Sequence, residues 1–147
     1  MCAFVSCESN SVISPGIVVY PQVVRISAEG VSDTITVTDS VNVGDTLRLT
    51  MHVNGYYDYL KSIVATSDVE KVKVSLPWNE EQTGVLAEDA DPENGKLVFK
   101  PDSVTVCVAV LRYIPLKSGA QSVHIAVRSN ARENYNYNEW TLPLGVR

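Results

Sequence analysis

The stretch Ser-Val-Asn-Val-Gly-Asp-Thr-Leu-Arg-Leu-Thr-Met-His-Val, residues 40–53, decides the fold of this chain. From residue 46 onward polar and apolar side chains alternate, and the apolar ones are Leu47, Leu49, Met51 and Val53. A strand with this two-residue period has one face on a core and the other in water. Gly44 and Asp45 come just before it and form a turn signal, because glycine accepts positive φ and aspartate bonds to nearby backbone. The stretch therefore predicts a half-buried β-strand preceded by a tight turn.

The same alternation recurs along the chain and predicts further short strands. They are expected at residues 17–19, 23–26, 34–38, 60–66, 72–76, 97–99, 104–111, 123–127 and 140–144. Pro21 predicts an edge strand or a crossover, and Pro143 places the last strand at an edge, because proline cannot donate to a ladder. Segment 104–111 is apolar on both faces, which predicts a central strand covered on both sides. No window has a capped helical period longer than about ten residues. The whole pattern predicts an all-β antiparallel sandwich of about eight to nine strands.

Two local patterns resemble bacterial immunoglobulin-like domains of the extracellular, often lipid-anchored kind. Val-Gly-Asp-Thr-Leu-Arg-Leu at residues 43–49 is similar to their strand entry. Tyr-Ile-Pro-Leu-Lys-Ser-Gly at residues 113–119 is similar to the turn before their last strands, where Pro115 and Gly119 would set the turn and Tyr113 would pack or hydrogen-bond at the corner. The resemblance implies an immunoglobulin-like sandwich used for display, adhesion or ligand binding, usually without catalysis. Because fold does not determine function, this step is an analogy.

Size and charge restrict the kinds of partner. The chain has 147 residues, which suits one domain, and a formal net charge of −5. A nucleic-acid binder needs a basic face to neutralise phosphates, so we expect no nucleic-acid partner. Segment 77–95 carries six acidic residues and neither Lys nor Arg, and we expect it to repel anionic partners. No stretch approaches the ~20 apolar residues of a membrane span.

The N-terminus carries a lipidation candidate. Ala-Phe-Val-Ser-Cys at residues 3–7 resembles the lipobox of bacterial lipoproteins, in which Cys7 would receive the lipid. The polar residues that follow resemble a tether, so residues 1–11 are interpreted as an N-terminal tether, with a possible signal remnant, and residues 12–147 as the sandwich domain. The alternative is a plain frayed terminus. If the lipobox holds, the protein is exported to the periplasm or cell surface and contacts the membrane only through Cys7.

The sequence does not predict an enzyme. Both histidines, His52 and His124, fall in predicted strands, and a strand-surface role is favoured over a catalytic base. Cys107 lies between valines and is interpreted as a small buried hydrophobe. No Gly-x-Ser-x-Gly elbow, phosphate loop, His-Glu-x-x-His or Cys-x-x-Cys motif is present.

Segment 88–95, Glu-Asp-Ala-Asp-Pro-Glu-Asn-Gly, is a weak calcium candidate. Asp89, Asp91 and Glu93 supply the hard oxygen ligands that calcium prefers, next to a turn glycine. The match to a calcium loop is imperfect, because Pro92 intervenes and Gly95 comes one place late. The alternative is a solvated hairpin tip. No other cofactor is expected.

Aromatic side chains give the best indication of function. They form two clusters, in which tyrosines and a tryptophan stand among asparagines: Tyr56, Tyr57, Tyr59, and Tyr135, Tyr137, Trp140. Aromatic rings cover the apolar faces of sugars, asparagine donates and accepts hydrogen bonds, and the same composition occurs in protein-binding loops. We therefore expect a non-catalytic cell-surface binding or adhesion module that presents aromatic loops to a protein or a glycan. The alternative is a structural spacer or assembly subunit without a small-molecule ligand, in which the aromatic residues are core.

Overall fold

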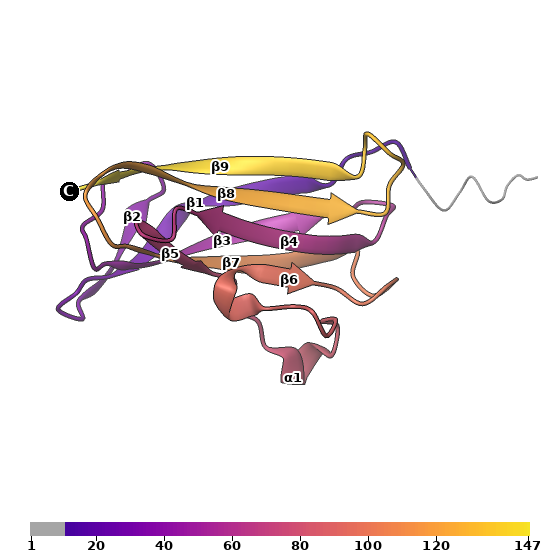
Figure 1. The fold of residues 1–147 in the computed structure, drawn as a ribbon, viewed down its shortest axis with the longest axis horizontal. Helices are drawn as coiled ribbons and strands as arrows, with labels where there is room; N and C mark the ends of the chain where they lie inside the picture. The colour runs from indigo at the N-terminus through magenta and orange to yellow at the C-terminus, as the bar shows by residue number, and fades with distance from the viewer. Residues whose placement is uncertain (1–10) are drawn as a thin grey trace, which may run out of the picture.

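The computed structural model describes residues 11–147, which form two antiparallel β-sheets packed face to face (Figure 1). In chain order the elements are β1 (Gly16–Ile26), β2 (Ser32–Thr36), β3 (Thr46–Asn54), β4 (Leu60–Ser67), β5 (Val72–Ser75), α1 (Glu80–Thr83), the 3-10 turn η2 (Pro92–Asn94), β6 (Lys96–Val98), β7 (Val106–Pro115), β8 (Gly119–Ser129) and β9 (Tyr137–Val146). One sheet has the order β2-β1-β3-β7-β5 and the other β6-β4-β8-β9. The predicted all-β sandwich of eight to nine strands is confirmed.

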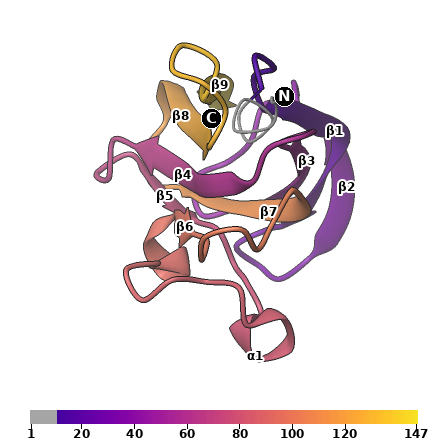
Figure 2. The ribbon, with the colours of Figure 1, turned by 90° about the vertical axis from the view of Figure 1, so that its right-hand side faces the viewer.

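The connections between strands follow the immunoglobulin-like order. In that fold the strands A to G form an ABED sheet and a CFG sheet. Here β1, β3, β7 and β5 stand at the A, B, E and D places, and β4, β8 and β9 at the C, F and G places. β2 is added beyond β1, and β6 is added beyond β4. Figure 2 shows the two layers from one end, with the four-stranded sheet on the left and β1 and β2 on the right.

The core lies between the sheets and comes directly from the alternation in the sequence. In β3 the apolar side chains Leu47, Leu49, Met51 and Val53 are fully buried, while His52 faces outward. Val123, Ile125 and Val127 of β8 are buried on the opposite layer. Burying one such side chain stabilises the fold by about 1.5–3 kcal/mol. The sandwich is therefore held chiefly by inward side chains that recur every second residue.

The prediction for Pro21 is wrong in part. Pro21 lies inside a continuous strand, β1, which pairs with β2 on one side and β3 on the other. The register against β3 shifts between Val19 and Val23, so Pro21 stands at a β-bulge, where its missing N–H breaks no regular ladder. The half of β1 before the bulge pairs with β3 alone, so this half is an edge of the sheet, as the proline had indicated.

The prediction that segment 104–111 is covered on both faces is also wrong. β7 is central in its sheet, but its outward residues Val106 and Val108 are 47% and 55% exposed. Its inward residues include Ala109, Leu111 and Tyr113, all buried. The apolar run therefore contains one ordinary core face and one apolar face open to solvent. Tyr113 packs in the core, opposite Leu47 in the ladder.

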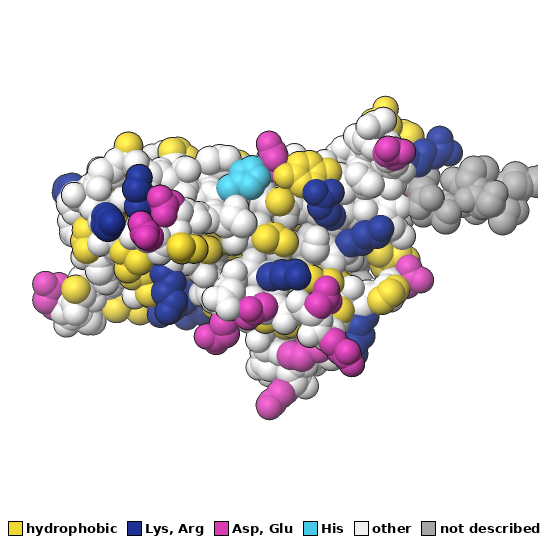
Figure 3. Space-filling view, in the orientation of Figure 1, with side chains coloured by type: hydrophobic (Ala, Val, Ile, Leu, Met, Phe, Trp, Pro, Cys, Tyr) yellow, Lys and Arg dark blue, Asp and Glu magenta, His cyan; other side chains and the backbone are white. Residues whose placement is uncertain are grey.

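The acidic segment ends in the hairpin tip that was the alternative for residues 88–95, because Asp91 pairs antiparallel with Lys96 across the turn at residues 92–95. It leaves β5 in one sheet, carries the single turn α1 and the turn η2, and enters β6 in the other sheet. We call residues 77–95 the acidic wing, which projects from the sandwich in Figure 1. Acidic side chains gather over it in Figure 3. Within residues 11–147 no helix has the length and apolar content needed to cross a membrane.

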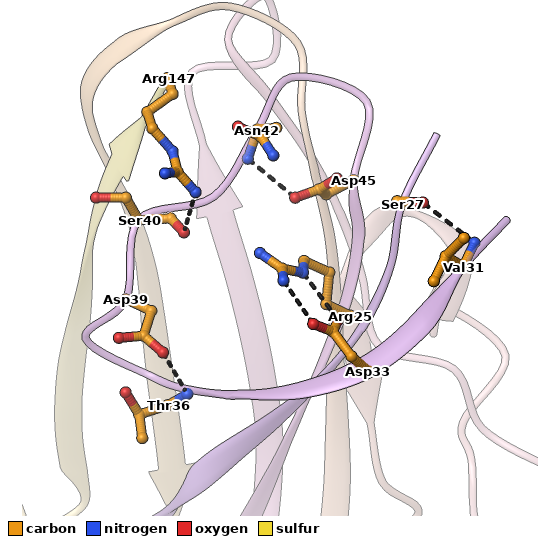
Figure 4. A network of polar contacts seen from close by, with 10 residues as sticks. All are labelled: Arg25, Ser27, Val31, Asp33, Thr36, Asp39, Ser40, Asn42, Asp45 and Arg147. Carbon is orange, nitrogen blue, oxygen red and sulfur yellow. Dashed lines mark hydrogen bonds and ion pairs between the residues drawn. The ribbon is translucent and has the colours of Figure 1, made fainter. Parts of the chain in front are cut away.

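Polar contacts close the end of the sandwich opposite the N-terminus of β1 (Figure 4). Arg25 makes two hydrogen bonds to Asp33, of 2.9 and 2.6 Å, across the β1–β2 hairpin. The Asp45 carboxylate is buried and accepts a hydrogen bond of 2.9 Å from the Asn42 backbone N–H, which accounts for the predicted Gly-Asp turn before β3. The Thr36 N–H donates to Asp39 in the same way. This end is therefore pinned by local polar bonds.

Candidate functional site: the aromatic loop end

Two loops meet at the other end of the sandwich, on the right in Figure 1. Residues 55–59 connect β3 to β4, and residues 130–136 connect β8 to β9. The Tyr59 N–H donates to the Asn130 Oδ1 at 2.9 Å, and the Asn130 N–H donates to the Tyr59 carbonyl oxygen at 3.0 Å. These reciprocal bonds join segments that are 71 residues apart in the chain. The first aromatic cluster and Tyr135 of the second cluster are therefore brought to one end.

The shape of the first loop follows from Asn54, Gly55 and Tyr56. Asn54 Oδ1 accepts a hydrogen bond of 2.7 Å from the Tyr56 N–H, and Tyr56 has a φ of 60°, which non-glycine residues rarely adopt. Gly55 is buried, and a Cβ at that position would collide with the Asp58 carbonyl oxygen. The Tyr56 ring turns back over Gly16 of β1, 3.2 Å from where a Cβ would stand. Small residues at positions 16 and 55 thus let the loop fold tightly.

A buried carboxylate holds this end together. Asp58 is 1% exposed and accepts hydrogen bonds from the backbone N–H and the hydroxyl of Ser11. The Ser11 carbonyl oxygen in turn accepts a hydrogen bond of 2.9 Å from the Arg132 N–H. Three segments, residues 11–15, 55–59 and 130–136, therefore form one connected end.

The structure leaves four tyrosine side chains exposed here. They are Tyr57 at 81%, Tyr56 at 50%, Tyr135 at 43% and Tyr59 at 38% exposure. We call these four residues the aromatic loop end. Val12 and Ile13, which the sequence analysis did not single out, are also exposed on the adjacent segment. The sequence does not mark Val12 and Ile13 as exposed, because two adjacent apolar residues near a terminus look like the start of a strand.

Tyr137 lies on the outer face of the four-stranded sheet rather than in the loop. The Arg128 guanidinium stacks over its ring at 4.6 Å, and its hydroxyl donates to Glu139 at 2.7 Å. The hydrogen bond to Glu139 raises the pKa of Tyr137. His124 also contacts Glu139, at 3.3 Å. Tyr137 is thus part of a polar network on that face, where acidic and basic side chains are interspersed (Figure 3).

Trp140 lies on the core-facing side of β9 and packs partly against the core. It lines a groove of about 380 Å³ together with Val37, Thr38 and the rest of the outer edge of β9. Trp140 therefore lies apart from the aromatic loop end.

The remaining reactive side chains stand at separate places. His52 faces outward on β3, and His124 Nδ1 lies 3.2 Å from the Thr141 hydroxyl on the outer face of the other sheet. Cys107 is half-buried on the inward side of β7, and burial raises its pKa to about 11. A thiol with so high a pKa is a poor nucleophile at neutral pH.

The calcium candidates Asp89, Asp91 and Glu93 lie on the acidic wing. Asp91 accepts a hydrogen bond of 2.8 Å from the Asn94 side chain and pairs through its backbone with Lys96. In the part of the chain that the structure describes, no three His, Cys, Asp or Glu side chains converge as metal ligands. Calcium binding stays a prediction and would need the wing to rearrange. Cys7, the lipidation candidate, lies outside the described residues, and so does Cys2.

The sequence analysis also missed an apolar surface next to the aromatic loop end. The outward residues Val18, His52 and Val108 stand side by side on β1, β3 and β7, and Val18 is 58% exposed. Val106 continues this row toward the loop. The signal was present in segment 104–111, whose outward valines were interpreted as buried.

Neither a scan against protein-family models nor a search of the curated proteins finds a match for this sequence. Among solved structures the chain is similar to the Salmonella SafD adhesin, with a TM-score of 0.44 and 8% sequence identity over 90% of this chain and 98% of that chain. It is similar to domains 4 and 5 of the S-layer protein SbsC as well, with a TM-score of 0.42 and 11% identity over 94% of this chain and 72% of that chain. Similarity at this level establishes no family.

Proposed function

We propose that this protein is a non-catalytic binding module of the cell surface, which contacts a protein or glycan partner through the aromatic loop end. The observation that carries the proposal is the grouping of four exposed tyrosines on two hydrogen-bonded loops. Large exposed apolar patches on a protein surface commonly mark interaction sites.

The chemistry of these side chains suits binding. A tyrosine ring covers an apolar surface, such as the face of a sugar or an aliphatic side chain, while its hydroxyl bonds to polar groups. Tyr57 is the most exposed of the four, and the Tyr135 N–H bonds back to the Arg132 carbonyl oxygen at 2.8 Å. The backbone N–H groups of Tyr56, Tyr59 and Tyr135 are held by local hydrogen bonds, which lowers the entropic cost of binding.

Backbone conformation gives further support. In residues 11–147 three non-glycine residues have positive φ, and two of them, Tyr56 and Asn134, belong to these two loops. Such conformations cost about 1–3 kcal/mol each and tend to cluster at functional sites. Loops B–C and F–G are also the places where other immunoglobulin-like sandwiches carry their binding loops.

An array that carries glycans and purified surface proteins on one slide would test the proposal. The labelled chain should bind a specific spot, and the double variant Tyr57→Ala/Tyr135→Ala should lose at least about tenfold in signal. Tyr20→Ala is the matched control, because Tyr20 is equally exposed at 44% but lies on β1. A hit among the glycans or among the proteins identifies the class of partner.

Two outcomes would contradict the proposal. One is an array without specific signal, and the other is a signal that the double variant retains. A thermal melt of each variant shows that loss of signal is not loss of fold.

Surface location belongs to the same proposal. If Cys7 carries a lipid, the full chain should partition into the membrane fraction of a bacterial host, and Cys7→Ser should move it to the soluble fraction. A chain that stays soluble in both forms would remove the anchor from the proposal.

The outer edge of β9 favours a second candidate function, that of an assembly subunit. β9 ends its sheet, and only Val41 pairs with its outer edge among the described residues, at the C-terminal end. The Gly145 carbonyl oxygen accepts a hydrogen bond from the Val41 N–H on the side of β9 away from β8. Backbone groups of every second residue of a strand point to the same side, so those of Thr141 and Pro143 also point away from β8. Pro143 leaves this edge one N–H short, as expected for an edge strand. The adjoining groove at Trp140 could receive side chains from an added strand.

Sedimentation velocity would test the assembly function. Strand addition between copies should give a concentration-dependent oligomer, and Thr141→Pro should reduce it, because an outward N–H is lost. A monomer at every concentration would contradict self-assembly.

A further inference from the structure

A pair of arginines stands in register on the outer face of the five-stranded sheet. Arg48 of β3 and Arg112 of β7 are direct partners in the antiparallel ladder, and both side chains point away from the core. Like charges directly opposite each other destabilise a sheet. Neither guanidinium makes a hydrogen bond or an ion pair with any side chain of residues 11–147.

Two other arginines of the same molecule have side-chain partners. Arg25 makes a two-point contact with Asp33, and Arg128 stacks over Tyr137. Arg132 is also without a side-chain partner among residues 11–147, but only Arg48 and Arg112 place two like charges directly opposite each other. An anionic group bound between the two guanidinium groups would offset the cost of this like-charge pair.

The acidic wing forms a rigid wall beside this pair. Trp78 Nε1 donates to the Thr83 hydroxyl at 2.8 Å, and the Trp78 ring stands edge-on to Phe99, with ring centroids 5.7 Å apart. The Leu76 N–H donates to the Pro92 carbonyl oxygen at 2.8 Å. These contacts tie the start of the wing to its end and hold the Trp78 ring in place.

Two hollows flank Trp78 and open onto the two arginines. The larger has a volume of about 620 Å³ and is lined by Arg48, Pro77, Trp78, Asn79, Glu80 and Glu81. The second, of about 390 Å³, shares Pro77 and Trp78 and adds Arg112, Lys73 and Glu93. Ligand pockets commonly measure about 300–1,000 Å³, so both hollows have room for a small ligand.

We propose that Arg48, Arg112 and Trp78 form a binding site for a sugar that carries a carboxylate. A guanidinium binds a carboxylate through two parallel hydrogen bonds, and an arginine pair provides two such forks. The indole of Trp78 offers an apolar surface for the face of a pyranose ring, and Asn79 offers donors and an acceptor for its hydroxyls.

The acidic residues around the hollows narrow the class of ligand. The Glu80 carboxylate is engaged within the wing, where it accepts bonds from the Leu86 N–H at 3.1 Å and the Thr83 hydroxyl at 3.2 Å. Glu81 also lines the larger hollow, and Glu93 lines the second one. These carboxylates repel anions, and a polyphosphate or nucleic acid carries more negative charge than the two arginines can balance. A ring with a single carboxylate, held by the arginine pair, and several hydroxyls fits the lining better. The site is separate from the aromatic loop end and goes beyond the function proposed for it.

Nuclear magnetic resonance of the indole N–H groups would test the site. The chain has two tryptophans, so Trp140→Phe assigns the Trp78 signal. Methyl β-glucuronide and sialyllactose should shift that signal in a saturable way, and methyl β-glucoside and lactose should bind at least about tenfold more weakly. The two pairs of probes distinguish uronic from sialic acids.

Variants separate this site from general charge effects. Arg48→Gln and Arg112→Gln should each weaken binding of the acidic probe by about tenfold or more, without lowering the melting temperature, because each relieves the like-charge pair. Arg132→Gln, the matched loss of one exposed charge at the aromatic loop end, should leave the affinity unchanged. Tyr57→Ala/Tyr135→Ala should also leave the affinity for the acidic probe unchanged. The acidic-sugar site and the aromatic loop end can therefore be contradicted independently of each other.

Four outcomes would overturn the proposal. They are equal binding of the neutral sugars, equal weakening by Arg132→Gln, an equal shift by sodium acetate, and no saturable shift by either acidic probe up to about 10 mM.

Discussion

Cys107 and Tyr113 show how the period of a single strand sets the chemistry of its side chains. Both face inward on β7, where Tyr113 is buried and Cys107 is half-buried against the core. Burial disfavours the charged form of an acid, so it raises the pKa of Cys107 to about 11 and that of Tyr113 to about 12. Both groups therefore stay neutral at every physiological pH.

These two pKa values predict a loss of stability in alkali. Between pH 9 and 12 the unfolded chain releases protons that the folded chain retains, so the stabilisation is complete below the unfolded pKa and falls as the pH rises. We expect the free energy of unfolding to fall by about 2–3 kcal/mol between about pH 8 and about pH 10.5. Urea unfolding at the two pH values measures the change.

Cys107→Ala provides the control for this prediction. It should reduce the alkaline loss by more than half, because Cys107 titrates at the lower pH of the two. An unchanged loss in the variant would show that other groups cause it.

At the scale of elements, the hydrogen bond from the Tyr59 N–H to the Asn130 side chain holds the two loops of the aromatic loop end together. Asn130→Ala removes the acceptor of the Tyr59 N–H, which should cost about 1 kcal/mol of stability. Amide hydrogen exchange at Tyr59 should accelerate about fivefold or more, because the two loops would open locally.

Asn136→Ala is the matched control, since Asn136 contacts Ser129 through its backbone carbonyl. Equal exchange rates at Tyr59 in the two variants would mean that the loops are held by something other than the Asn130 side chain.

At the scale of the whole molecule, the segment before β1 belongs to the fold. Ser11 supplies two donors to the buried Asp58 carboxylate and an acceptor to Arg132. A chain of residues 15–147 should lose about 1–3 kcal/mol of stability against both the full chain and a chain of residues 11–147, because a buried carboxylate loses its donors. Chemical denaturation of the three chains measures this.

Ser11→Ala in the full chain tests the same contact without truncation. It should produce part of the loss, since the backbone N–H remains. Equal stability of all four proteins would show that Asp58 finds other donors.

The aromatic loop end could be foreseen only in its parts. The two tyrosine clusters were visible in the sequence, but their meeting depends on the reciprocal bonds of Tyr59 and Asn130 across 71 residues. The same holds for Arg48 and Arg112, which become neighbours only through the β3–β7 register. Trp140 is close to the loop tyrosines in the sequence but apart from them in the structure, because its position in the two-residue period of β9 turns its side chain toward the core.

The sequence by itself determined the all-β class, the inward residues of each strand and the turn before β3, because these follow from a two-residue period and from local backbone chemistry. Only the tertiary structure decided which strand faces stay open, which loops meet and which charges face each other, because these depend on strand order and register between distant segments. The apolar segment 104–111 illustrates the boundary. Its strand character was readable from composition, but whether its second face is covered depends on what the rest of the chain packs against it.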